Sequence, residues 1–312
     1  MRLALATIVA VLSFSAAQAE LKADPVIVTQ VMDSYPAVSP DGKALLFQST
    51  RSGRLALYLA DISDDNVRLL LDSGDDPVVP SWSPDGSMIA YAATVDGQSE
   101  IFVMQADGTQ SRRLTNDPGD DSHPHWSADG RIFFNSARTT PDRNADWSDQ
   151  WHEIFSMNAD GGEIIQHTNC RAVCTFATPS PDGRMITYRR VIDAPGRNWS
   201  QSAIERNSEI FVATLDGADE RNISNDPAFD GWPVWSPDSK WIAFASNRDG
   251  VPNAAQVYVT SPNGKTTKRI TTGPWSHAQP SFSPDGSTIY AYRLLEGDGF
   301  EFGHIAAYAT GF

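Results

Sequence analysis

Basic residues, cysteines and long apolar segments are all scarce in this chain of 312 residues. It has 24 lysines and arginines against 39 aspartates and glutamates, which gives a net charge of −15. Nucleic-acid binding and attachment to an anionic membrane surface both need clustered positive charge, so the composition argues against both. The charge balance leaves three kinds of partner: a cationic protein surface, a divalent metal ion or a neutral glycan.

Beyond the first twenty residues, no apolar stretch is long enough to cross a bilayer. The N-terminus itself has the pattern of a secretory signal peptide: Arg2 precedes an apolar run over 3–14, and Ala17-Gln18-Ala19 offers a small-x-small cleavage site. We therefore expect residues 1–19 to be removed and residues 20–312 to form a periplasmic or secreted protein with no membrane span.

The chain has only two cysteines, Cys170 and Cys174. Export permits a disulfide, and the close spacing of the pair would fasten one short loop. Two free buried thiols are the alternative. The pair is not a zinc motif by itself, because a structural zinc ion needs two further ligands nearby.

A phrase close to Ser-Pro-Asp-Gly recurs through the chain. Its proline sets φ for the first corner of a tight turn, its aspartate favours the second corner, and its glycine accepts the positive φ that follows. Each copy therefore predicts a hairpin between two strands. The six copies begin at Ser39, Ser83, Ser127, Ser180, Ser236 and Ser283.

Each turn belongs to a longer repeating unit of about 45 residues. In four units Pro-x-Trp or Pro-x-Phe precedes the turn, and a β-rich run such as 88–91 follows it. A third predicted strand such as 101–104, an Asp-Gly or Asn-Gly turn and a fourth strand complete the unit. Four antiparallel strands in each unit, and six units, predict an all-β six-bladed propeller.

The sixth unit ends one strand short, while an additional strand over 26–30 precedes the first unit. We expect this N-terminal strand to complete the last blade and close the ring, because closure removes exposed strand edges. The propeller then occupies residues 20–312, and no separate domain is expected.

These turns, the preceding Pro-x-Trp and the Glu-Ile-Phe type of third strand resemble the repeats of the TolB-like β-propeller family, over roughly residues 25–312. The family includes periplasmic proteins that dock a peptidoglycan-associated lipoprotein on a propeller face, the propeller halves of peptidases and stand-alone propellers, so the resemblance implies the architecture and no particular partner. TolB carries an α/β domain ahead of its propeller. Only about twenty residues separate the expected cleavage point from the first turn here, so we expect the propeller alone.

Loop length is uneven around the predicted ring. All turns on one face are short, whereas on the other face the third and fourth units carry insertions over 137–151 and 190–207. Extra loop length on one face of a repeat protein often marks its binding face. The large aromatic and basic side chains of these loops are candidate ligand-binding residues: Arg143, Trp147, Trp151, Arg197 and Trp199.

Loops between units place further candidates at the mouth of the predicted channel. Three carboxylates near one opening could hold a cation or the basic end of a peptide, and solvated loop residues are the alternative. Equivalent positions ahead of the repeated serine hold Asp33, Asp121, Asp230 and His277, and the next positions inward include His123 and Trp232.

His123-Pro124-His125 places two imidazoles on the same side of a strand, as metal ligands require. The pair resembles the His-x-His pair with which oligogalacturonate lyases, of a related seven-bladed propeller type, hold a metal ion. His277 would have to supply a third ligand, and packing of His125 beside Trp126 is the alternative. Nucleophilic catalysis has no support, since no Gly-x-Ser-x-Gly elbow is present.

The sequence therefore favours an exported propeller that binds an envelope protein or peptide at its channel mouth and needs no cofactor. The alternative is an enzyme at the same mouth, a lyase or hydrolase that acts on a glycan with the help of a divalent metal ion.

Overall fold

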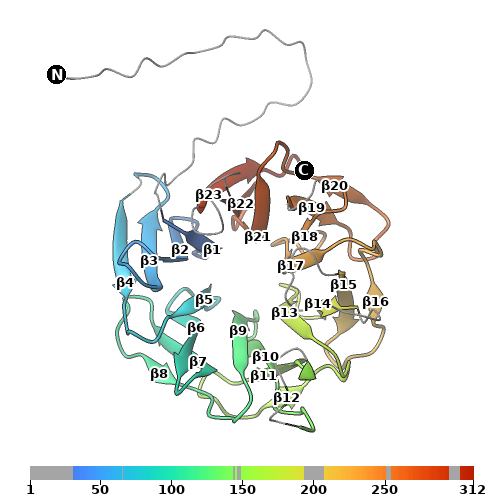
Figure 1. Ribbon diagram of the computed structural model, residues 1–312. Coiled ribbons are helices and arrows are strands. Elements are labelled where there is room, and N and C mark those ends of the chain that lie inside the picture. The colour runs from blue at the N-terminus through green and yellow to red at the C-terminus, as the bar shows by residue number, and fades with distance from the viewer. Residues whose placement is uncertain are drawn as a thin grey trace, which may run out of the picture.

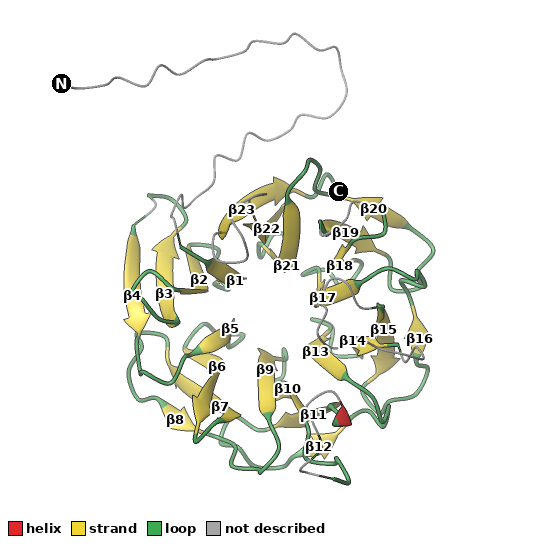
Figure 2. Ribbon diagram, viewed as in Figure 1, coloured by secondary structure: helices red, strands yellow, loops and turns green. Residues whose placement is uncertain are grey.

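The computed structural model describes residues 31–64, 66–142, 145, 149–192, 207–250, 254–294 and 303–312. Their strands form six antiparallel sheets set around a central axis (Figures 1 and 2). Five sheets have four described strands and the sixth has three. This arrangement confirms the six-bladed β-propeller. None of the described segments forms a helix of the length and apolar character that a membrane span requires.

Each blade runs outward in chain order, so its first strand borders the central channel (Figure 1). Blade one comprises β1 (Asp33–Val38), β2 (Ala44–Ser49), β3 (Ala56–Asp61) and β4 (Val67–Leu71). Blade two comprises β5 (Val78–Trp82), β6 (Met88–Val95), β7 (Gln98–Gln105) and β8 (Arg112–Arg113). Blade three comprises β9 (Asp121–Trp126), β10 (Ile132–Ser136), β11 (Glu153–Met157) and β12 (Ile165–Gln166).

The other three blades repeat this order. Blade four comprises β13 (Cys174–Pro179), β14 (Met185–Val191), β15 (Ser208–Thr214) and β16 (Arg221–Asn222). Blade five comprises β17 (Asp230–Trp235), β18 (Ile242–Ser246), β19 (Gln256–Thr260) and β20 (Thr267–Arg269). Blade six comprises β21 (Ser276–Phe282), β22 (Thr288–Leu294) and β23 (Gly303–Ala309).

The repeated turns join the first and second strands of every blade as the sequence predicts. In the first turn the amide of Gly42 donates to the carbonyl of Ser39 at 2.9 Å, and the Ser39 hydroxyl donates to Asp41 at 2.7 Å. The fourth residue has a positive φ in all six turns, from 58° at Ser239 to 83° at Gly130. Glycine is therefore the favoured residue at this corner.

The seam between the last and first blades resembles the other seams. The strand predicted over 26–30 lies outside the described residues, so three strands of the sixth sheet are described. Met32, just before β1, forms a parallel bridge with Gly303 of blade six. The equivalent bridge between blades three and four joins His152 and Val173. Blade six therefore meets blade one through the same kind of bridge that joins blade three to blade four.

Candidate functional site

Each inner strand is interrupted by a β-bulge at the same place. The pairing of β1 with β2 shifts register between Ser34 and Ala37, and equivalent shifts occur in the other five blades. One residue of every bulge has a left-handed backbone with φ between 51° and 58°, although none is glycine. These residues are Tyr35, Val79, His123, Phe176, Trp232 and Gln279.

The bulges carry strain and change the direction of side chains. A left-handed conformation costs a residue other than glycine about 1 kcal/mol or more, and a β-branched residue such as Val79 is the least suited to it. A bulge also breaks the alternation of a strand, so three successive residues of each inner strand line the channel. The middle residue is proline in every blade except the fourth, which has Ala177.

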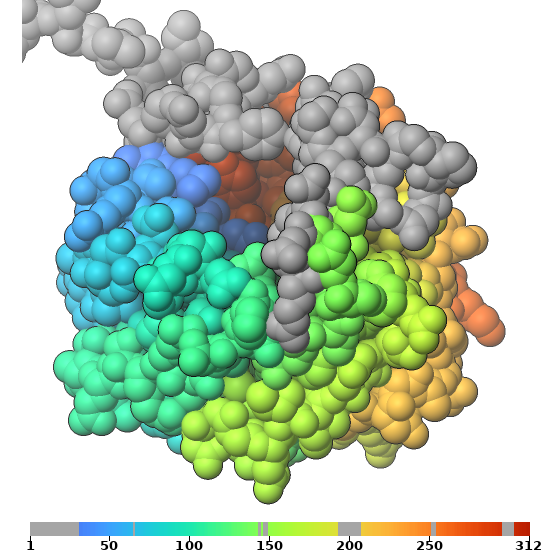
Figure 3. Space-filling model, turned by 60° about the horizontal axis from the view of Figure 1, so that its bottom comes forward, coloured from blue at the N-terminus to red at the C-terminus, as the bar shows by residue number. Residues whose placement is uncertain are grey.

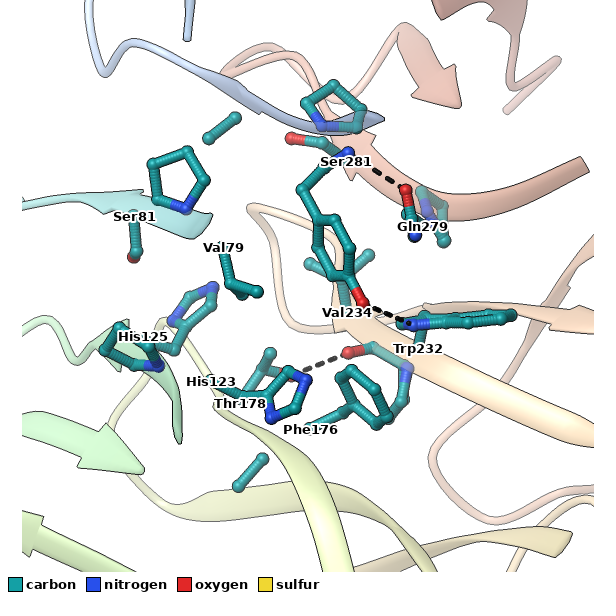
Figure 4. Close-up of a pocket in the computed structure, with 18 residues that line it drawn as sticks. Val79, Ser81, His123, His125, Phe176, Thr178, Trp232, Val234, Gln279 and Ser281 are labelled. Atoms are coloured by element: carbon teal, nitrogen blue, oxygen red, sulfur yellow. Dashed lines mark hydrogen bonds between the residues drawn. The ribbon is translucent and has the colours of Figure 1, made fainter. Parts of the chain in front are cut away.

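The six bulges enclose a cavity of about 120 Å³ near the channel axis. Figure 3 shows a hollow between the first blade, in blue, and the last, in red, and Figure 4 shows the lining side chains. Each blade contributes three lining residues, and none of these is aspartate, glutamate, lysine or arginine. The site therefore suits an uncharged group about as large as a side chain.

Four bulge side chains form an aromatic arc around part of the cavity. The ring of His123 meets Phe176 edge-on at 4.1 Å between centroids, and Phe176 meets Trp232 in the same way at 5.8 Å. The indole Nε1 of Trp232 donates to the hydroxyl of Tyr35 at 3.4 Å. The guanidinium of Arg189 also lies over the ring of Phe176, 5.9 Å from its centroid. Such a surface favours flat groups that stack on it.

Two neutral histidines present hydrogen-bond acceptors to the cavity. The Nδ1 of His123 lies 3.0 Å from Oδ1 of Asn135, whose amide group donates to Ser122 at 2.7 Å. With Oδ1 of Asn135 as the acceptor, Nδ1 carries the proton. The Nδ1 of His125 likewise donates to the carbonyl of Trp126 at 3.0 Å. Burial lowers the pKa of His125 and lowers that of His123 to about 3, so both Nε2 atoms are unprotonated at neutral pH.

The opposite wall presents donors. Oε1 of Gln279 accepts a hydrogen bond from the backbone amide of Tyr35 at 2.9 Å, and its NH₂ group donates to the Tyr35 hydroxyl, which leaves its second N–H to donate to a ligand. The Tyr35 hydroxyl accepts from Trp232, so its own proton is available, and burial raises its pKa further. Figure 4 shows His123 and His125 on one side of the cavity and Gln279 on the other. The two walls therefore have complementary polarity.

The three aspartates predicted at the channel mouth lie instead inside their blades. All are fully buried, and each accepts two hydrogen bonds of 2.8–3.1 Å from one arginine of its own blade. This corrects the prediction that they hold a cation or a basic peptide, because their charge is already compensated. The pairs are Asp33 with Arg51, Asp121 with Arg138 and Asp230 with Arg248.

Blade three shows how these ion pairs are held. The guanidinium of Arg138 donates to Ser136 at 2.8 Å and lies over the rings of Phe134 and Phe155, at 5.2 and 4.9 Å. Burial still raises the pKa of Asp121 to about 6. A Ser-x-Arg sequence at the end of the second strand accompanies the aspartate in blades one, three and five, and this signal could have revealed the pairing.

The predicted metal ligands are not brought together. His277 is fully buried in blade six, with its ring edge-on to Tyr308 at 5.3 Å, whereas His123 and His125 line the channel cavity. Throughout the described ranges, no three histidine, cysteine, aspartate or glutamate side chains are grouped closely enough to hold a metal ion. The geometry therefore gives the glycan-cleaving alternative no metal centre.

The candidates from the long loops divide into two groups. Trp151 lies in the described part of the chain, where its backbone amide donates to Thr140 at 2.9 Å and Arg171 lies 5.7 Å from its ring. It borders a separate polar cleft between blades three and four, not the channel cavity. The remaining loop candidates lie outside the described residues: Arg143, Trp147, Arg197 and Trp199.

The loop between blades three and four is fastened twice. Cys170 and Cys174 are joined by a disulfide. The buried carboxylate of Glu153 accepts hydrogen bonds from the hydroxyl of Thr168, at 2.6 Å, and from the backbone amides of Cys170 and Arg171. The loop that leads into β13 is therefore held in place beside the channel strand.

Sequence reasoning missed the role of this buried glutamate. Its position near the start of the third strand carries glutamate or glutamine in four blades, with threonine or serine fifteen residues later as its partner. The repeated spacing was a readable signal. The pairs are Glu100 with Thr115, Glu153 with Thr168, Glu209 with Ser224 and Gln256 with Thr271.

Comparison with known sequences finds a match to a family of propeller domains, the TolB beta propeller domain, over residues 36–191 and 199–307. A protein from Chlorobium luteolum named as a TolB homologue is 33% identical over 138 residues, which cover 44% of this chain and 28% of that protein. The first two curated relatives are matched over only 20% and 28% of their own lengths.

Solved structures share the fold at low identity. A putative TolB from Agrobacterium tumefaciens has a TM-score of 0.67 at 22% identity, with 90% of this chain and 92% of that chain covered. An oligogalacturonate lyase solved with manganese has a TM-score of 0.60 at 12% identity, with 95% and 96% covered. At these identities the likeness shows the fold alone.

Proposed function

Because the chain belongs to the TolB β-propeller family, we propose that it is an exported binding module that receives a segment of an envelope protein in its channel. The observation that carries this proposal is the ring of six strained bulge residues around the cavity. Backbone strain persists where the surrounding structure enforces it, and it concentrates at ligand sites.

The chemistry of the cavity supports binding over catalysis. Its lining has no carboxylate or cation to act on a substrate, and burial lowers the pKa of both histidines, which makes them weak bases. A pocket with aromatic walls and a few polar atoms suits the anchoring side chain of a protein partner. A periplasmic location accords with the predicted signal peptide and with the relatives named TolB.

Photo-crosslinking in cells tests the proposal. Benzoylphenylalanine is introduced at Phe176, in the channel ring, and in a matched control at Leu69, which is 49% exposed on the outer strand β4. After irradiation, mass spectrometry identifies the crosslinked proteins. We expect an envelope-protein adduct at position 176 that is absent at position 69. Equal adducts at both positions, or no protein adduct at 176, would contradict the proposal.

A further inference from the structure

The channel cavity has acceptors on one wall and donors on the other. In the ring of six, blade three faces blade six, so the free Nε2 atoms of His123 and His125 lie across the cavity from the NH₂ of Gln279 (Figure 4). The Tyr35 hydroxyl adds a donor on the side of Gln279, and the ring of Trp232 forms a flat wall between the two sides.

We propose that this cavity is a subsite for an uncharged amide group, such as a partner's asparagine or glutamine side chain. The N–H of the amide is directed to His123 and its carbonyl to Gln279. The inference rests on the proposed binding function and adds the chemical class of the group that enters. An amide fits because it is flat, neutral and has a donor at one end and an acceptor at the other.

Charged groups fit this cavity poorly. A carboxylate or an ammonium would lose its hydration in a site whose lining offers no opposite charge, which is costly. A carboxylate would also face the lone pair on Nε2 of His123, and an ammonium would find no carboxylate among the lining residues. The wall chemistry therefore selects against charge of either sign.

A purely apolar group is also a poor match, although it would fill the space and stack on the aromatic arc. It would leave the Nε2 of His123 and one N–H of Gln279 without partners. Sites built around hydrogen-bonding groups reject ligands that lack the matching atoms, because each buried polar group left unpaired costs free energy. Discrimination between an amide and a hydrocarbon of the same shape is thus expected.

Four small probes of similar shape test, on the purified mature chain, whether the cavity prefers an amide over charged and apolar groups. They are benzamide, benzoate, benzylamine and toluene, which place an amide, an anion, a cation and a methyl group on the same ring. The readout is the ¹H–¹⁵N resonance of the Trp232 indole, assigned with the Trp232→Phe variant. We expect a saturable shift with benzamide and at least about tenfold weaker binding of the other three. Equal or tighter binding of any of them, or no saturation by benzamide, overturns the inference.

Variants on each wall test the orientation. His123→Phe keeps a flat ring and removes the acceptor, and Gln279→Leu removes the donor on the opposite wall. Each is expected to weaken benzamide binding about tenfold, while Leu69→Ala on β4 leaves it unchanged. If His123→Phe does not fold, Gln279→Leu decides the question by itself. Unchanged affinity in a folded wall variant overturns the inference.

The dependence of benzamide binding on pH gives an independent readout. Burial lowers the pKa of His123, with His152 and Arg189 nearby acting in the same direction, so Nε2 stays unprotonated from pH 8 to pH 5. We expect constant affinity across this range. A histidine with an ordinary pKa of about 6.5 would gain a proton and lose about tenfold in affinity by pH 5.5. Such a loss would contradict the assigned acceptor.

The two proposals fail separately. If a protein adduct forms at position 176 and benzamide does not bind selectively, the amide inference is wrong and the binding function stands. If benzamide binds selectively and no protein adduct forms, the cavity chemistry stands and the proposed protein partner is wrong.

Discussion

Inside blades one, three and five, a single arginine compensates the charge of a buried aspartate. Asp121 and Arg138 lie inside blade three with 0% and 15% of their side chains exposed, and the guanidinium is further held by Ser136 and two aromatic rings. The net benefit of a buried ion pair is small, because desolvation offsets the attraction of the charges. Removing one partner is different, since the other charge is then left buried and uncompensated.

We predict that Arg138→Ala lowers the free energy of unfolding by about 3 kcal/mol or more. Arg184→Ala is the matched control: Arg184 pairs with Asp182 at 3.9 Å, but its side chain is 83% exposed, so a change within about 0.5 kcal/mol is expected. Urea denaturation of both variants measures the difference. Similar losses of unfolding free energy in the two variants would show that the buried Asp121–Arg138 pair matters no more for stability than an exposed pair.

At the scale of the element, the inner strand combines a bulge with a proline. The bulge residue with a left-handed backbone faces the channel. The proline that follows it has no amide hydrogen, so no hydrogen-bond partner is needed at that point. The two devices recur together in five blades and place the ring of side chains at one level. In blade four, Ala177 stands in place of proline, next to Phe176 and the disulfide-fastened loop.

The strain at the bulge can be measured at Val79, the only β-branched residue among the six. Asparagine tolerates the left-handed region better than valine, so we predict that Val79→Asn raises the free energy of unfolding by about 0.5–1 kcal/mol. The neighbouring Val78 has no positive φ and packs against the core, so Val78→Asn is expected to be destabilising. Denaturant titrations measure the free energy of unfolding of both variants. A loss of stability in Val79→Asn would contradict the strain at this position.

At the scale of the whole molecule, stability comes from clusters shared between blades. Leu45 and Phe47 of blade one pack with Tyr290 and Ile305 of blade six, and every other pair of neighbouring blades shares a cluster of its own. An open stack of repeats has two free ends and can unfold from them. In this ring each blade has two neighbours, so we expect one cooperative unfolding transition.

The variant Ile305→Ala tests this cooperativity at the seam. Ile305 is fully buried, so its truncation should cost about 2–5 kcal/mol. In a closed ring, the most protected backbone amides of β10 and β14, far from the seam, should lose the same free energy of protection. Native-state hydrogen exchange measures this. A loss confined to blades one and six would indicate an open array.

The sequence by itself determined the number of blades and the positions of the six turns that join first and second strands. Proline, aspartate and glycine act on φ at their own positions, so a turn such as the one at Ser39 needs no distant partner to be recognised. The periodic spacing then gave the propeller. The chemistry of the site was less accessible: His123 and Trp232 were selected as candidates, whereas Tyr35 and Gln279 were not, because their roles depend on contacts between blades that are far apart in the sequence.

Tertiary structure alone decided which of the polar residues are available to a ligand. Asp33, Asp121, Asp230 and His277 occupy equivalent repeat positions, yet burial against partners within their blades removes them from the channel. The proton position on His123 depends on Asn135, which is adjacent only because β9 pairs with β10. Local preferences are encoded residue by residue, whereas solvation and hydrogen-bond pairing depend on which surfaces meet when the ring closes.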